Sequence, residues 1–166
     1  MKSLKWFCII GAVVTTILGV ISHFVYDWTG GNFFVGLFFP INESTWEHMK
    51  LLFFPMFGYA LIAGKRMEEK YPCIYNAMFA GILVGLLLIP VLFYTYTGVL
   101  GFNVDWVNIA LYVISVLAAY YVVYRVAVKC TSGESKLLRY AMYVLLVAFM
   151  VFSVYPPKLG IFVSPV

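Results

Sequence analysis

Two histidines and three carboxylates of this chain lie at the ends of predicted helices, at spacings that could build a metal site. His23 and Asp27 are four residues apart and share one helical face, and Glu43 and Glu47 repeat this spacing beside His48. Imidazole and carboxylate groups bind zinc, manganese and iron, and a metal-bound water is a nucleophile near neutral pH. We therefore predict a divalent metal (zinc, manganese or iron) with His23, Asp27 and His48 as ligands.

The residues around these groups supply further candidates for chemistry. Glu47 or Glu43 would act as a general base, since each would lie beside the metal. Ser44 would orient a substrate through its hydroxyl group. The residues predicted to bind a ligand are Ser44, Asn42, Trp46 and Lys50.

The same residue types also have purely structural explanations. Ser44-Thr45-Trp46-Glu47 matches a capping box, in which the serine and glutamate side chains satisfy free N–H groups at a helix start. Glu43 would favour the positive end of that helix, and His23 would bond to Asp27. A metal-free binding or proton-relay site is a further alternative.

The elements that position these residues are membrane helices, because the chain is far too apolar for a soluble protein. Of its 166 residues 64% are hydrophobic and only 11% are charged. A membrane-spanning helix needs about 20 mostly apolar residues. Five segments qualify and predict an all-α polytopic integral membrane protein, a five-helix transmembrane bundle that forms a single domain over 1–166: 6–26, 44–64, 73–99, 106–128 and 138–155.

A shorter apolar stretch, 33–39, follows the turn residues Gly30 and Gly31 and cannot span the membrane. We predict that it is interfacial or re-entrant. Small residues at four-residue spacing, such as Gly11, Thr15 and Gly19, favour close helix packing in lipid. Packing within the chain is the preferred interpretation, and a homo-oligomer interface is the alternative.

The positions of the cations predict the orientation, because Lys and Arg in short loops stay on the cytoplasmic side. Nine of the 11 cations fall on one side of the five spans, and only Lys50 and Lys158 fall on the other. We expect a multi-pass protein of the cell membrane with a cytoplasmic N-terminus and an extracytoplasmic C-terminus. The net charge of +4 then reflects topology, and nucleic acid is not an expected partner.

The stretch Pro40-Ile41-Asn42-Glu43-Ser44-Thr45-Trp46-Glu47-His48-Met49-Lys50, preceded by 22–28, resembles a family of small bacterial multi-pass membrane proteins classed as a domain of unknown function. The resemblance covers most of the chain and supports the location of the site, and it implies no activity. A looser likeness exists to membrane-embedded hydrolases of the ceramidase and adiponectin-receptor type. Those look like seven-helix proteins with three zinc-binding histidines, whereas this chain has five candidate spans and two histidines.

These observations favour a polar site at the extracytoplasmic membrane face that binds a metal or a small polar ligand. It would hydrolyse or bind a lipid or amphiphile, so the bilayer and a lipid are the expected partners. One alternative is a small permease or transporter subunit in which the same carboxylates couple to ions or protons. A structural or accessory membrane protein is the other, and the sequence leaves open whether the protein is an enzyme.

Overall fold

The computed structural model describes residues 2–129 and 135–165, which are helical over most of their length. Their helices are, in chain order, α1 (Lys2–Trp28), α2 (Phe33–Gly36), α3 (Thr45–Glu68), α4 (Ile74–Leu100), α5 (Asp105–Lys129), α6 (Lys136–Val154) and the 3-10 turn η1 (Gly160–Phe162). Each of the five predicted spans overlaps one long helix. The short α2 lies within the predicted interfacial stretch 33–39.

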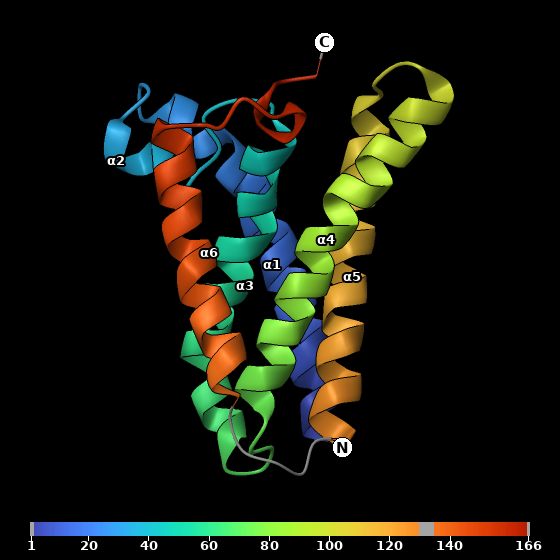
Figure 1. The fold of residues 1–166 in the computed structure, drawn as a ribbon. Coiled ribbons are helices and arrows are strands. Elements are labelled where there is room, and N and C mark those ends of the chain that lie inside the picture. The colour runs from blue at the N-terminus through green and yellow to red at the C-terminus, as the bar shows by residue number, and fades with distance from the viewer. Residues whose placement is uncertain (1, 130–134, 166) are drawn as a thin grey trace.

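The five long helices stand side by side, and the chain runs along the bundle in alternating directions (Figure 1). The start of α1 therefore lies at the opposite end from η1. Helices α4 and α5 form the most extensive pair, α3 packs between α1 and α4, and α6 makes a lighter contact with α3 and α4. Together with α2 and η1, the outer ends of α1, α3 and α6 form one polar end of the bundle.

Four of these helices, α1, α4, α5 and α6, are long and apolar enough to cross a membrane. Much of their apolar surface faces outward, as at Leu87 and Leu137, whose exposed fractions are 66% and 78%. The protein is accordingly a multi-pass membrane protein. Helix α3 is not among the four because polar residues lie near both of its ends, including Lys50 and Lys65.

The small residues of α1 and α4 bring helices together within the chain. A Cβ atom at Gly19 would overlap the hydroxyl oxygen of Tyr112 on α5. At Gly81 it would lie 2.7 Å from the carbonyl oxygen of Ala119. Both crossings depend on the missing side chain, as expected for close helix contacts in lipid.

Pro55 lies inside α3 and makes a backbone acceptor available to a neighbouring helix. Proline has no N–H, so the carbonyl of Leu51, four residues earlier, lacks its usual helical donor. The hydroxyl group of Tyr112 lies 3.1 Å from this carbonyl oxygen and 2.9 Å from that of Thr15. The proline thus creates a polar junction where α1, α3 and α5 meet.

Candidate functional site

The start of α3 is specified by two short polar side chains. The backbone N–H of Ser44 donates to the side-chain oxygen of Asn42 at 2.9 Å, and the Ser44 hydroxyl accepts from the N–H of Glu47 at 3.4 Å. Half of the predicted capping box is therefore present. The reciprocal bond is absent, because the N–H group of Ser44, which would donate to the Glu47 carboxylate in a full capping box, donates to the Asn42 side chain instead.

Lys50 is buried and holds the segment before α3 in place. Its ammonium nitrogen lies 2.7 Å from the Glu47 carboxylate and donates to the carbonyl oxygens of Gly36 at 2.8 Å and Phe39 at 3.3 Å. An ammonium group has three hydrogens, so these three acceptors satisfy it. Lys50 was predicted to bind a ligand, but here its donors are all used within the protein.

The Glu47 carboxylate is equally enclosed, with 2% of its side chain exposed. Besides Lys50 it accepts from the backbone N–H of Ile41 at 3.1 Å and from the hydroxyl of Ser153 on α6 at 2.8 Å. These bonds join the 37–44 loop, α3 and α6. Glu47 is predicted to be a general base. In the structure, however, both of its carboxylate oxygens have partners within the protein, and Glu47 does not line the pocket described below.

Trp46, another predicted ligand-binding residue, packs among aromatic rings. Its ring centroid lies 4.6 Å from that of Phe149, 5.6 Å from that of Phe152 and 4.9 Å from that of Phe162. Among the described residues its indole nitrogen is buried without a hydrogen-bond partner. In this position Trp46 connects α3 to α6 and η1.

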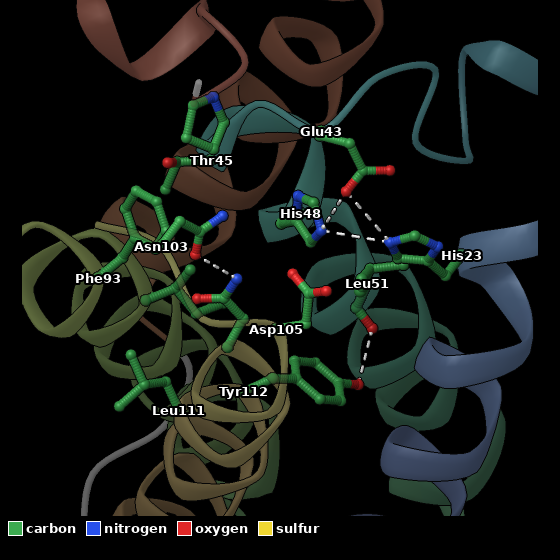
Figure 2. A pocket seen from close by; sticks show the side chains of 13 residues that line it. His23, Glu43, Thr45, His48, Leu51, Phe93, Asn103, Asp105, Leu111 and Tyr112 are labelled. Atoms are coloured by element: carbon green, nitrogen blue, oxygen red, sulfur yellow. Dashed lines mark hydrogen bonds and ion pairs between the residues drawn. The ribbon is translucent and has the colours of Figure 1, made fainter. Parts of the chain in front are cut away.

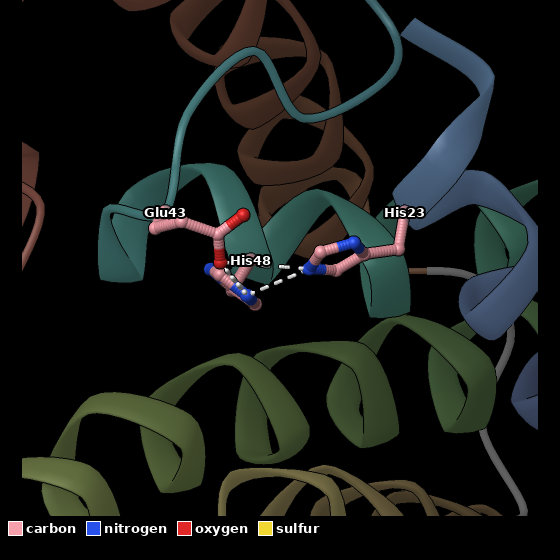
Figure 3. A group of neighbouring side chains, drawn as sticks. All are labelled: His23, Glu43 and His48. Carbon is pink, nitrogen blue, oxygen red and sulfur yellow. Dashed lines mark hydrogen bonds and ion pairs between the residues drawn. The ribbon is translucent and has the colours of Figure 1, made fainter. Parts of the chain in front are cut away.

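His23, Glu43 and His48 meet at the polar end of the bundle. The Nε2 atoms of the two histidines are 3.3 Å apart, and the Glu43 carboxylate oxygen lies 3.6 Å from that of His23 and 3.4 Å from that of His48. Figure 3 shows the side chains of Glu43 and His23 both pointing toward His48. Among the described residues, these three form the group whose ligand atoms could hold one metal ion.

A backbone carbonyl group fixes the orientation of the His48 ring. Its Nδ1 lies 3.0 Å from the carbonyl oxygen of Ser44, which can only accept, so Nδ1 carries the hydrogen and donates. In the neutral ring Nε2 then presents its lone pair toward His23 and Glu43. A backbone carbonyl on the far nitrogen is the usual support of a metal-binding histidine.

The three separations fit tetrahedral coordination. Ligand atoms placed about 2.0–2.1 Å from zinc at tetrahedral angles lie roughly 3.3–3.4 Å from one another. The observed distances of 3.3, 3.4 and 3.6 Å agree with this to within a small side-chain adjustment. Two imidazoles and one carboxylate would leave the fourth position open, as catalytic zinc sites do.

The group opens into a pocket of about 420 Å³ among α1, α3, α4 and α5 (Figure 2). One part of its lining is polar and the other apolar. The lining residues are His23, Glu43, Thr45, His48, Leu51, Ile89, Phe93, Asn103, Asp105, Asn108, Leu111, Tyr112 and Pro165. The junction at Tyr112 and Leu51 forms the pocket floor.

A second polar network borders the pocket at the α4–α5 connection. The amide of Asn108 donates to the side-chain oxygen of Asn103 at 2.8 Å, and the hydroxyl of Tyr96 lies 2.7 Å from the same oxygen. Neither asparagine was singled out from the sequence. Their position after a predicted span and at the start of the next was the available signal.

Asp27 was predicted as the third metal ligand, but Glu43 lies in that position. Asp27 is exposed in the last turn of α1, outside the three-residue group and the pocket. Four residues of helix rise displace it by about 6 Å along the axis from His23. Glu43 precedes the N-cap of α3, where its side chain can extend over the first turn to His48.

The whole chain, residues 1–166, matches the model of the family described as Family of unknown function (DUF6512). The chain belongs to this family. Neither a curated protein nor a solved structure matches it. The resemblance inferred from the Asn-Glu-Ser-x-Trp-Glu-His-x-Lys motif is confirmed at the level of an uncharacterised family.

Proposed function

We propose that this protein binds a divalent metal ion through His23, Glu43 and His48. The observation that carries the proposal is the set of three ligand-atom distances, together with the backbone support of His48. Zinc suits this donor set best, and manganese or iron would also accept it. The side chains are 29–64% exposed, which leaves the metal open to water and to a ligand.

The charges of the pocket support a dication. Two carboxylates, Glu43 and Asp105, line it with two histidines, and no Lys or Arg is among the described lining residues. A divalent ion would balance both negative charges. Without it, the described lining offers these two acids no Lys or Arg.

We further propose that the metal acts on a lipid or amphiphile at the extracytoplasmic face, by binding or hydrolysis. Leu51, Ile89, Phe93 and Leu111 would contact an apolar chain while the metal contacts a polar head. The site lies at the end of the bundle opposite the start of α1. With the positive-inside orientation this end is extracytoplasmic.

The pocket floor favours this function over a transporter subunit. Tyr112 and Leu51 line the pocket and meet at the junction that also includes Thr15. We propose that this junction closes the pocket toward the bundle centre, and access from one side would suit binding or hydrolysis. Membrane insertion of all five long helices, including α3, is part of the same proposal.

A structural role is the second candidate for part of the motif. The buried Glu47–Lys50 pair and the Trp46 ring contacts join α3 to the preceding loop and to α6. We propose that these residues support the site and do not take part in its chemistry. Within the motif, Glu43 and His48 would then bind the metal, and Glu47 and Lys50 would stabilise the fold.

Metal analysis of the purified protein tests the proposal. After incubation with zinc and desalting, mass spectrometry should find about one zinc per wild-type chain and none in a His23→Ala/His48→Ala variant. Glu43→Gln should lower the zinc content. Asp27→Asn removes the same charge outside the group and should leave it unchanged. Equal zinc in wild type and the histidine double variant would contradict the site.

A further inference from the structure

Asp105 is the remaining carboxylate of the pocket. It is the first residue of α5, and its side chain lines the pocket with His23, Glu43 and His48. Figure 2 shows it between Tyr112 and the two histidines. Within the described residues its carboxylate takes part in no hydrogen bond or ion pair. It is therefore free to accept a proton or a hydrogen bond from a bound molecule.

The geometry separates Asp105 from the metal ligands. The ligand atoms of His23, Glu43 and His48 lie within 4.8 Å of one another, and Asp105 does not belong to this group. It lines their pocket without being one of the three ligands. As the carboxylate of the same pocket that is not among the three ligands, Asp105 is the group that could accept a proton from a molecule bound there.

We infer that Asp105 is the general base in the hydrolysis of a carbonyl-containing amphiphile, an acyl ester or amide, an inference that rests on the proposed metal site. A water at the open coordination position gives a proton to Asp105 while its oxygen bonds to the carbonyl carbon. The bond from that carbon to the leaving oxygen or nitrogen then breaks. The leaving atom keeps the electron pair and takes the proton from Asp105, so water and substrate give a carboxylic acid and an alcohol or amine.

The pocket lining supports an acyl compound as the substrate class. Below the polar groups, Ile89, Phe93 and Leu111 offer an apolar wall to a hydrocarbon chain. The chain would hold the carbonyl group near the metal and Asp105. A short acyl group gains less from this wall, so a long-chain ester should react with a higher kcat/KM than an acetate.

Ester hydrolysis by the zinc-loaded protein tests this inference. p-Nitrophenyl decanoate and p-nitrophenyl acetate would be given to wild type, Asp105→Asn, Asp105→Glu and Asp27→Asn, with zinc content measured on the same samples. We expect Asp105→Asn to lower kcat by about 10²- to 10⁴-fold with its zinc content unchanged. Asp105→Glu should restore part of the loss. Asp27→Asn, the same charge change outside the pocket, should behave as wild type.

The two proposals fail in different ways. A zinc-loaded wild type that hydrolyses decanoate no faster than the His23→Ala/His48→Ala variant would overturn the hydrolytic role and leave the metal site standing. Equal kcat in wild type and Asp105→Asn would overturn the role of Asp105. A wild type that binds no zinc would overturn the metal site itself.

Discussion

Two groups of polar side chains draw on residues of the segment 42–50, one of them together with His23 of α1, and they differ in burial and in how their polar atoms are satisfied. Lys50 and Glu47 form an ion pair whose side chains are 0% and 2% exposed. His23, Glu43 and His48 form an open group that faces a pocket. The first group has a partner in the protein for each of its charged atoms, whereas the second directs its ligand atoms at one shared point.

This difference indicates which group stabilises the fold and which group could bind a ligand. Buried charges persist only where the protein itself satisfies them, and a satisfied group has nothing left to offer a ligand. The ligand atoms of an open group whose lone pairs converge can be stabilised more by a bound cation than by the neighbouring protein atoms. The partners of each polar atom therefore predict its role better than its residue type does.

The largest effect should come from breaking the buried pair. Lys50→Met leaves the Glu47 carboxylate buried without its cation and should lower the free energy of unfolding by about 3–5 kcal/mol. Circular dichroism during denaturant titration in detergent would measure it. Glu43→Gln is the matched control at an exposed carboxylate and should have a far smaller effect. A loss no greater than that of Glu43→Gln would contradict the structural role of the pair.

Metal binding should give the next largest effect, and only at the open group. A ligand that binds only the folded state at about 100 times its Kd stabilises it by about 2.7 kcal/mol. Zinc should therefore raise the Tm of wild type, compared with samples in chelator. His48→Ala should show no shift with zinc. A zinc-induced shift that survives in His48→Ala would place the metal elsewhere.

A smaller effect should follow when the buried pair loses its link to α6. Ser153→Ala removes the hydroxyl that donates to Glu47 at 2.8 Å, and a hydrogen bond to a charged group contributes about 1.5–3 kcal/mol. We expect a loss of about 2 kcal/mol in unfolding experiments, with unchanged zinc content. Reduced zinc content would mean that the two groups are coupled.

The smallest effect should come from Tyr112, and it tests whether this residue belongs to the structural contacts or to the reactive site. Tyr112 lines the pocket, yet its hydroxyl is bound to backbone carbonyls. Tyr112→Phe should cost about 1 kcal/mol of stability, in the range of hydrogen bonds between membrane helices. Zinc content and ester hydrolysis should stay as in wild type. A fall in kcat without a change in stability would mean that Tyr112 takes part in the reaction.

Much of the fold could be predicted because apolar length and turn residues are local properties. The predicted segment 106–128 overlaps α5, Asp105–Lys129, and 138–155 overlaps α6, Lys136–Val154. Ser44 could likewise be recognised as an N-cap from the residues that follow it. The convergence of His23 and His48 was a reasonable prediction, since both lie at the same predicted end.

The division of roles within the motif could not be read from the sequence. We propose a structural role for Glu47 because its carboxylate accepts from the N–H of Ile41 and from the hydroxyl of Ser153, which lies 106 residues away. Glu43 lies beside the histidines because the chain bends at residues 41–43 before α3 begins, whereas helical spacing favoured Asp27. Both outcomes depend on how separate helices are placed relative to one another, which residue spacing does not encode.

The composition of α3 also has a consequence for how the protein is made. With Glu47, His48 and Lys50 near one end, this helix is less apolar than the four candidate spans. Lys50 finds its acceptors only after the segment 33–41 has folded back upon it. During biosynthesis α3 should therefore leave the translocation channel together with the residues that precede it, and not as an independent unit.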